Sequence, residues 1–385
     1  KKKKRIFEPN EKIRLSAGTI KELVKRFEEV DLHLIEDDLN GRMFETFLNA
    51  TLRGKSLGQY FTPRSIVDIA VGLSDLHVGR NISDCSQIID ACCGSGEFLI
   101  GDLNGMWEKV DSNASLSMKE KQEIKKNIAE NCIWGIDAAR DPALARIARM
   151  NMFLHGIVAE NQKLRNGDTL DGDWPTGEET DFNMVLMNPP YSAKWSAAAG
   201  FLQDERFSDY GVLAPKSKAD YAFLLHGLYH LKNNGTMAIV LPHGVLFRGA
   251  AEGKIREKLL RSGNIYAVIG LPANLFYNTS IPTCIVVLKK HRDGRDVLFI
   301  DASQKFEKGK KQNAMTDEHI DAVMELYKNR KTVEKESYLA SFEDIEKNDF
   351  NLNIPRYVDN FEEEEEIDLD ELLTSISTID DEIEK

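Results

Sequence analysis

Short apolar runs, separated by stretches with helical spacing, recur through the middle of the chain. Runs of this length, bounded by polar or turn-forming residues, predict buried β-strands. Strands that alternate with helices are typical of a mostly parallel sheet, so the pattern predicts an α/β fold. The predicted strands lie at 87–89, 131–136, 184–187, 236–241, 265–271 and 284–288.

Apolar residues at helical spacing also mark both ends of the chain. Ser16–Val30 and Leu39–Leu52 predict a small helical lead-in, and Glu318–Asn329 predicts a helix after the sheet. Beyond Glu366, apolar residues return at helical spacing in an acidic tail, which suits packing against a partner. We therefore expect three regions: a helical segment at 1–52, the α/β domain at 53–300, and a helical region with the acidic tail at 301–385.

The strand predicted at 184–187 ends at two prolines, in the sequence Asn188-Pro189-Pro190-Tyr191. Because proline cannot continue a strand and pushes the preceding residue toward extended backbone, Asn188 should lie at the strand's carboxyl end. Open α/β sheets bind ligands at that edge. The Asn188 amide and the free carbonyls beside it can hold a planar amino group, and Tyr191 offers a ring to stack on it. Taken alone, however, Asn-Pro-Pro favours an ordinary turn.

The strand predicted at 87–89 leads into an acid and then into a glycine turn before an apolar helix begins. Glycines there let a ligand approach the backbone closely. The turn lacks the third glycine of dinucleotide sites and the Gly-Lys-Ser/Thr of phosphate loops. It suits a nucleoside without phosphates, such as S-adenosylmethionine. The candidate cofactor residues here are Asp90, Cys92, Gly94, Ser95 and Gly96.

Two more acids and two aromatic residues lie in loops next to predicted strands. Asp137 closes the strand at 131–136, where an acid in a doubly wound sheet reaches ribose hydroxyls. Asp168 suits either an adenine amino group or the shaping of a turn. Phe276 and Tyr277 lie in a polar loop, and they suit either ordinary core packing or stacking on a base.

Three other segments have simpler interpretations. Thr62 can cap a helix that begins at Pro63. The loop at 192–217 is rich in Ala, Ser, Gly and Lys, so we expect it to be mobile. His226 and His230 are four residues apart, but no third ligand accompanies them, so we interpret them as surface or core residues and expect no metal.

The charge is unevenly distributed along the 385 residues. The net charge is −13, but residues 361–385 hold twelve acidic residues and one lysine, so the rest carries only −2. Neither part has the basic footprint of a protein that holds nucleic acid unaided. No apolar run is long enough to span a membrane, and no signal peptide opens the chain. Five cysteines without a metal-binding pattern indicate reduced thiols and a cytoplasmic location.

The order of these segments resembles that of amino-group adenine DNA methyltransferases of the gamma type. More narrowly, it resembles the modification subunit of type I restriction-modification systems, whose members usually carry a longer helical domain before the Phe-Thr-Pro sequence. The similarity runs from about Asp38 to Tyr357, and it includes segments at 145–156, 219–223, 241–248 and 351–357. The motifs that carry it are Phe61-Thr62-Pro63, Asp90 to Gly96, Asp137, Asp168 and Asn188-Pro189-Pro190-Tyr191.

The resemblance implies a seven-stranded, mostly parallel, Rossmann-like sheet with helices on both faces that binds S-adenosylmethionine. It implies that Phe61 and Thr62 border the methionine end of the cofactor, with Asn188 close by. Asp90 and the glycine turn line the cofactor, Asp137 takes the ribose hydroxyls and Asp168 faces the adenine.

For the target, the resemblance implies methyl transfer to the N6 amino group of adenine in DNA. The Asn188 side chain and the Pro189 carbonyl would accept the two N–H bonds. Tyr191 would stack on one face of the base, with Phe276 or its neighbour Tyr277 on the other. The base must leave the duplex because its amino nitrogen is otherwise paired and stacked.

The resemblance also implies partners. A specificity subunit reads the DNA sequence, two copies of this chain join it, and a restriction subunit completes the larger complex. We expect 367–383 to dock on the specificity subunit; the alternative is a disordered tail that aids solubility. Other functions stay open: a stand-alone adenine DNA methyltransferase, a glutamine or RNA methyltransferase with the same Asn-Pro-Pro-Tyr sequence, or a non-catalytic assembly subunit.

Overall fold

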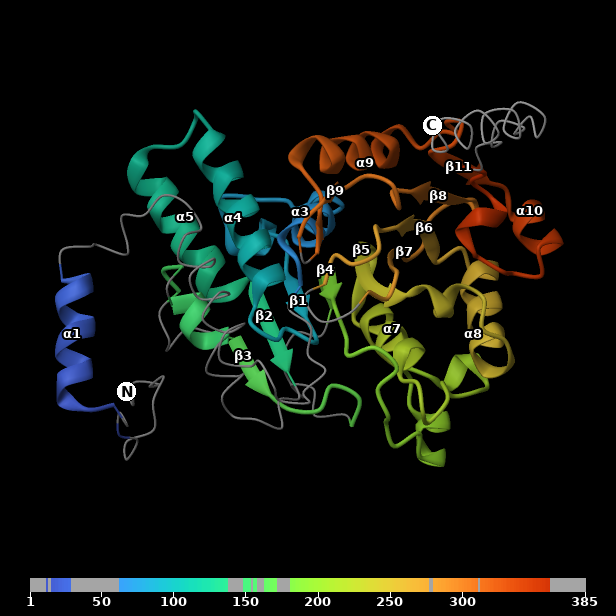
Figure 1. Cartoon of the computed structure of the whole chain (residues 1–385), viewed down its shortest axis with the longest axis horizontal. Helices are drawn as coiled ribbons and strands as arrows, with labels where there is room; N and C mark the ends of the chain where they lie inside the picture. The colour runs from blue at the N-terminus through green and yellow to red at the C-terminus, as the bar shows by residue number, and fades with distance from the viewer. Residues whose placement is uncertain are drawn as a thin grey trace, which may run out of the picture.

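One sheet of nine strands crosses the described part of the molecule, with helices on both faces (Figure 1). In this computed structural model, the described residues are 12, 15–28, 62–137, 148–153, 155–157, 163–171, 181–276, 280–310 and 312–360. Several predictions lie outside them: the helix at 39–52, Phe61, Tyr277 and the tail from residue 361. The α/β class, the mostly parallel sheet and the helices on both faces are confirmed.

The strand order across the sheet is β11-β8-β6-β7-β5-β4-β1-β2-β3. Only the contacts of β7 with β5 and β6, and of β11 with β8, are antiparallel. The strands are β1 (Ile88–Asp90), β2 (Ile133–Asp137), β3 (Lys163–Asn166), β4 (Phe182–Met187), β5 (Leu231–Pro242), β6 (Ile265–Gly270), β7 (Thr283–Lys289), β8 (Val297–Asp301) and β11 (Ser337–Ala340). A separate two-stranded ribbon joins β9 (Glu307–Lys308) to β10 (Asn313–Ala314).

The expected count of seven strands was too low. The six strands that we located in the sequence leave out β3 at one edge of the sheet and β8 and β11, which extend the sheet beyond β6. β11 is a four-residue antiparallel edge strand with only its two end residues buried, so it carries little apolar signal. The boundary that we predicted at residue 300 falls inside β8. The segment from β8 to β11 therefore continues the main sheet.

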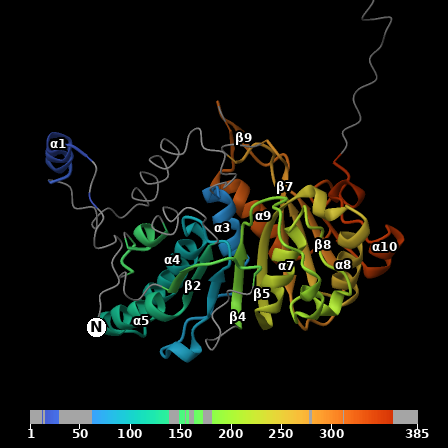
Figure 2. The same cartoon turned by 90° about the horizontal axis from the view of Figure 1, so that it is seen from below.

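Strand residues alternate between two hydrophobic cores, one on each face of the sheet. In β4, Met184 and Leu186 join one core, while Val185 and Met187 join the other. Both faces of a central strand are thus buried, which explains its continuous apolar run. Helices α3 (Arg64–Gly72), α4 (Glu97–Ser112), α5 (Met118–Asn131) and α9 (Asp317–Asn329) cover the first core, and α7 (Asp220–Tyr229), α8 (Ala250–Arg261) and α10 (Phe342–Lys347) cover the second (Figure 2). Helix α1 (Ala17–Phe27) buries none of its residues.

The chain changes direction across the sheet between β1 and β4. From β1 it continues to β2 on one side, whereas β4 and β1 are parallel neighbours and β5 lies on the other side of β4. Such a switch point opens a crevice at the carboxyl ends of the strands, where ligands of α/β proteins bind. Asp90 ends β1 and Asn188 follows β4, so both lie at this crevice.

The loop at 192–217, which we expected to be mobile, has an aromatic core of its own. The rings of Trp195, Phe201 and Phe207 lie 5.3 to 5.7 Å apart between centroids. Trp195 and Phe207 are buried. The Ala-, Ser- and Gly-rich composition concealed these widely spaced rings, which pack the loop against the second core.

Strand β5 begins earlier than the strand that we predicted at 236–241. Helix α7 ends at Tyr229 and β5 begins at Leu231, so the strand starts five residues before the predicted Thr236. The register with β4 shifts between Phe182 and Met184, and Asn234 has a φ of +63°. The Asn-Asn-Gly sequence therefore forms an irregularity within a strand.

Candidate active site

Asn188 lies between two hydroxyl groups at the switch point. Its amide Nδ2 lies 2.9 Å from the Thr62 hydroxyl, and the Tyr191 hydroxyl donates to its Oδ1 at 2.9 Å. A hydroxyl can donate as well as accept, so both contacts survive if the amide is turned over. The two contacts therefore fix the plane and position of the amide. Asn188 is half-buried, with Pro189 buried behind it.

Thr62 does not cap the helix that follows it. Pro63 is the N-cap of α3, and the cap has no side-chain hydrogen bond. The Thr62 hydroxyl instead meets Asn188, 126 residues away in the sequence. This corrects the interpretation of Thr62 as a helix cap and brings Thr62 next to the Asn-Pro-Pro-Tyr segment.

The rings of Tyr191 and Phe276 touch each other at the same edge. Their centroids are 5.9 Å apart and their planes are perpendicular. Phe276 is 2% exposed, and Tyr191 is half-buried. Perpendicular rings in contact leave no slot for a base between them. Stacking of both rings on a target base, as predicted, therefore requires at least one ring to move.

The glycine turn after β1 is held by carboxylates. Asp90 accepts from the backbone N–H of Cys92 at 2.9 Å, and Asp137 accepts from the N–H of Gly94 at 2.7 Å. Gly94 and Gly96 have φ values of +49° and +88°, which explains why glycine is needed at both positions. A Cβ atom on Gly94 would meet nothing within 4 Å, so open space lies over the turn.

Negative charge accumulates around this turn. Burial raises the pKa of Asp90 well above its usual value, and the nearby carboxylates of Asp137 and Glu97 raise it further. Burial likewise raises the pKa of the Cys92 thiol, with added contributions from Asp90, Asp137 and Asp168. Four acidic residues therefore concentrate negative charge around the glycine turn: Asp90, Glu97, Asp137 and Asp168. Such a region favours cations and hydroxyl donors over phosphates.

Asp168 lies in the loop after β3 and is exposed. Its carboxylate accepts from the N–H of Leu170 at 3.0 Å, so it shapes a turn whatever else it binds. The neighbouring Thr169 hydroxyl donates to the carbonyl of Ala91 at 2.6 Å, which joins this loop to the glycine turn. Asp90, Asp137 and Asp168 thus come from three adjacent strands to one edge.

Sequence reasoning missed two residues that hold this edge together. Arg206, which is 7% exposed, donates to the carbonyls of Thr169 and Leu170, both at 3.0 Å. Asn151 is buried and donates to the carbonyl of Ser95 at 3.0 Å. Arg206 comes from a loop whose composition offered no reason to single it out. Asn151, in contrast, lies in a segment whose resemblance to the family was noted.

His226 and His230 are both core residues, with ring centroids 4.7 Å apart. Burial lowers the pKa of His226 well below its usual value, so its ring is neutral at physiological pH. Among the residues that the structure describes, no three His, Cys, Asp or Glu side chains cluster as metal ligands.

A cavity of about 390 Å³ adjoins the site on the side of Thr62. Among the described residues, Thr62 is the only predicted cofactor residue that lines it. Its other lining residues include Glu97, Asn151, His155, Leu275 and Met315. The cavity thus extends from the switch-point edge of the sheet to the amino-terminal ends of α3 and α4, where we expect the methionine end of the cofactor.

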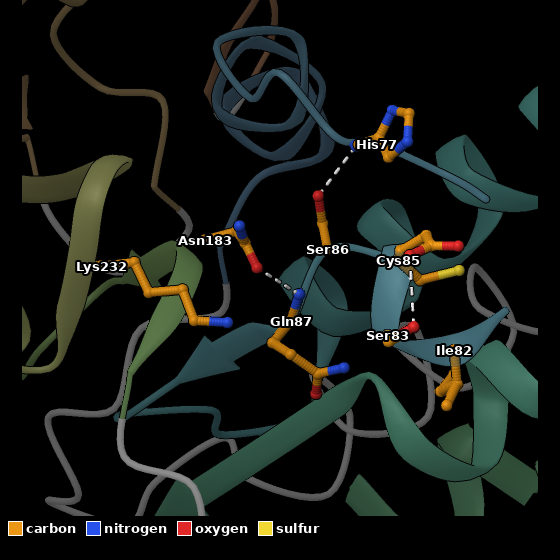
Figure 3. A pocket seen from close by; sticks show the side chains of 9 residues that line it. His77, Ile82, Ser83, Cys85, Ser86, Gln87, Asn183 and Lys232 are labelled. Carbon is orange, nitrogen blue, oxygen red and sulfur yellow. Dashed lines mark hydrogen bonds between the residues drawn. The ribbon is translucent and has the colours of Figure 1, made fainter.

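A second cavity, of about 440 Å³, opens at the opposite edge of the sheet (Figure 3). Its lining residues include Gln87, just before β1, and Lys232, near the start of β5. Asn183 accepts from the backbone N–H of Gln87 at 2.9 Å, and Ser86 accepts from that of His77 at 2.8 Å. These groups support the local backbone. None of the predicted site residues lies here.

Comparison with models of protein families shows which family the chain belongs to. The sequence model of the family described as N-6 DNA Methylase matches residues 35–366. The chain belongs to this family. The resemblance inferred from its sequence is therefore confirmed.

Several relatives of the chain are methylase subunits of type I restriction enzymes. The MpnII methylase subunit of Mycoplasma pneumoniae is 34% identical over 378 residues, which cover 94% of this chain and 65% of the relative. The MjaVII methylase subunit of Methanocaldococcus jannaschii is 30% identical and covers 94% of this chain and 60% of the relative. The chain thus spans less than two thirds of the length of these proteins.

Solved structures agree with the family assignment. The methyltransferase subunit of a type I restriction-modification system from Streptococcus thermophilus is 46% identical, with a TM-score of 0.74. The match covers 89% of this chain and 68% of that one. A structure from work on the assembly of a type I system has a TM-score of 0.69 at 20% identity, which supports the shared fold. Across the described residues, no helix of this methylase-family chain is both long and apolar enough to cross a membrane.

Proposed function

We propose that this chain forms the catalytic part of a type I modification subunit, which transfers a methyl group from S-adenosylmethionine to the N6 amino group of adenine in DNA. The observation that carries the proposal is the position of Asn188. Its amide is held between Thr62 and Tyr191 at the switch point, beside the acid-lined glycine turn. Membership of the N-6 DNA methylase family supports the same reaction.

The residues around the glycine turn fit S-adenosylmethionine. When bound, this cofactor supplies an electrophilic methyl group on a positively charged sulfur. The carboxylates of Asp90, Asp137 and Glu97 favour that charge, and the space over Gly94 admits a ligand against the backbone. Asp137 would accept from the ribose hydroxyls and Asp168 from the adenine amino group, with Phe61, Thr62 and Asn188 toward the methionine end. The rest of the cofactor site would be lined by Cys92, Ser95 and Gly96.

On the target side, Asn188 would orient the amino group of the adenine. Its Oδ1 has two lone pairs, so it can accept from the amino group while it still accepts from the Tyr191 hydroxyl. The Pro189 carbonyl would accept the second N–H bond, and Pro190 keeps the chain extended. With both N–H bonds held, the nitrogen lone pair points away from the protein acceptors and toward the methyl group. Positioning and electrostatics therefore carry the rate enhancement.

Tyr191 and Phe276 would hold the flipped base once their rings part. The present contact between them is edge-to-face, at 5.9 Å between centroids. Entry of a base would replace this contact with a stacked one and would release Phe276 from its buried position. A large rotation of the Tyr191 ring would break the hydrogen bond from its hydroxyl to Asn188, and a small rotation would preserve it.

The proposed partners follow from the relatives, which are methylase subunits of multi-subunit restriction enzymes. A specificity subunit would choose the DNA site, two copies of this chain would bind it, and a restriction subunit would join the larger complex. Residues 367–383 would dock on the specificity subunit. The near-neutral charge outside the tail supports reliance on a partner for DNA affinity.

The test uses the full-length protein purified with its partner subunits, labelled S-adenosylmethionine, and separate DNA, RNA and protein substrates. We expect label only in DNA, at N6 of adenine. Asn188→Ala should lower the rate by about 100-fold or more, because an oriented polar group in the reaction centre is lost. Cofactor affinity, measured by calorimetry, should change little.

Asn329→Ala provides the matched control, because Asn329 is an exposed residue at the end of α9. This variant should methylate DNA at the wild-type rate. Label in RNA or in a glutamine side chain would assign the chain to another reaction with the same Asn-Pro-Pro-Tyr sequence. Full activity of Asn188→Ala would refute the role of Asn188.

A further inference from the structure

The residue after the Asn-Pro-Pro-Tyr sequence has an unusual backbone conformation. Ser192 has a φ of +49°, in the left-handed region that side chains other than glycine rarely adopt. Such a conformation persists only where its surroundings impose it. Tyr191 lies directly before it, so the direction of the chain at Tyr191 depends on what holds Ser192.

The start of α7 holds Ser192 and the next residue at two points. The Asp220 carboxylate accepts from the Ser192 N–H at 2.8 Å through Oδ1. The N–H of Ala219 donates to the carbonyl of Ala193 at 2.9 Å. Asp220 is 0% exposed and Ala219 is buried, so both points are anchored in the second core. The backbone after Tyr191 is therefore fixed to a buried helix.

A buried ion-pair network holds the Asp220 carboxylate in turn. Its second oxygen, Oδ2, lies 2.6 Å from a terminal nitrogen of Arg248. The Arg248 Nε lies 2.6 Å from the carboxylate of Glu252, whose side chain is only 3% exposed. The two oxygens of Asp220 therefore have separate roles. One oxygen holds the strained backbone at Ser192, and the other pairs with the Arg248 guanidinium group.

We propose that Asp220 is a positioning residue for the target base. Its carboxylate holds Ser192 in the left-handed conformation, and this conformation fixes the Tyr191 ring beside Asn188 and Phe276. Asp220 itself touches no reacting atom. The inference rests on the proposed function, since it assigns a role within the same site.

The test compares Asp220→Ala, Asp220→Asn and Glu252→Gln in the full-length protein with its partner subunits. Asp220→Ala should lower kcat by about tenfold or more, because misplacement of a contact group by an ångström has effects of this size. Asp220→Asn keeps an oxygen for the Ser192 N–H, so its kcat should stay well above that of Asp220→Ala. Cofactor affinity should be unchanged in both.

Glu252→Gln separates positioning from general stability. It disturbs the same cation, Arg248, but leaves the bond from Ser192 to Asp220 in place. We expect a lower melting temperature with a near-normal kcat. If Glu252→Gln loses as much kcat as Asp220→Ala, the role of Asp220 is only structural and the proposal is overturned.

Rescue by glycine is the decisive measurement. Glycine adopts the left-handed conformation without a Cβ clash, so Ser192→Gly should return part of the kcat lost in Asp220→Ala, about threefold or more. No recovery, or wild-type kcat in Asp220→Ala alone, would overturn the proposal. Should Asp220→Ala not fold, the triple variant Asp220→Ala, Arg248→Met and Glu252→Gln, which leaves no member of the ion-pair network charged, takes its place. A wild-type complex that methylates no DNA refutes instead the proposed function.

Discussion

On the β1–β3 side of the sheet, carboxylates at the site accept from backbone N–H groups, whereas on the β5–β8 side a carboxylate that accepts from a backbone N–H also pairs with a guanidinium group. Asp90 and Asp137 accept from the N–H groups of Cys92 and Gly94. Asp220, in contrast, pairs with Arg248, which also pairs with Glu252. Negative charge therefore has different partners on the two sides, although both sides contribute to the same edge of the sheet.

This difference matches the two roles that we propose for the edge. Carboxylates whose pKa is raised by burial and by one another, as at Asp90, favour the arrival of a cation such as a sulfonium group. A carboxylate that is already paired with a cation, such as Asp220 with Arg248, attracts a second cation less strongly. Asp220 instead fixes the backbone at Ser192. We therefore propose that the β1–β3 side binds the charged cofactor and that the β5–β8 side keeps the pocket for the target base rigid.

The largest effect should come from removing the cation on the second side. Arg248→Met leaves Asp220 and Glu252 without their shared partner, and a broken buried pair costs about 3–5 kcal/mol of unfolding free energy. Denaturant unfolding measures the loss. Arg80→Met is the control, because its pair with Glu120 is exposed and such pairs contribute about 0–1 kcal/mol. If Arg248→Met and Arg80→Met lose the same free energy of unfolding, the ion pairs of Arg248 are no more important for stability than an exposed pair.

A smaller effect, of opposite sign, should come from the first side. Asp102 in α4 is 0% exposed, and its carboxylate oxygens have no hydrogen-bond partner among the described residues. Burial raises its pKa well above 3.8, and Asp90 raises it further. The folded protein therefore binds this proton more tightly than the unfolded chain. The stabilising contribution is complete below the unfolded pKa and is lost as the pH rises toward the folded pKa.

Asp102→Asn, which cannot ionise, should therefore unfold at higher denaturant than wild type at pH 8 and show a smaller difference at pH 5. The difference in unfolding free energy between Asp102→Asn and wild type can grow by at most about 1.4 kcal/mol for each pH unit. Glu108→Gln, at an exposed position of the same helix, should show no such growth. A gap that is constant with pH would mean that Asp102 does not titrate differently in the folded protein.

The smallest effect concerns the contact that joins the two sides. Thr62, just before α3, holds the Asn188 amide that follows β4. Thr62→Ala removes one hydrogen bond, with a net contribution of about 0.5–1.5 kcal/mol, so kcat/KM for methyl transfer should fall roughly 3- to 10-fold. Thr62→Ser keeps the hydroxyl and should retain most of the activity. Equal activities of the two variants would assign no role to the hydroxyl.

The sequence by itself was enough to predict the α/β class, six of the nine strands in the main sheet, and the motifs at their carboxyl ends. These features are local: a buried central strand must be apolar along its length, and a strand must stop where prolines follow. It was also enough to group Asp90, Asp137 and Asn188, because parallel strands place their carboxyl ends at one edge. The family resemblance added their proposed roles.

Only the tertiary structure decided which side chains hold the edge together. Thr62 meets Asn188, Ser192 meets Asp220, and Arg206 meets Thr169 across long stretches of chain. Composition and periodicity report whether a residue is buried, but they do not report which partner it meets. A buried carboxylate such as Asp220 and one such as Asp102 look alike in sequence, and what separates them is the order of the strands and the helices that cover them.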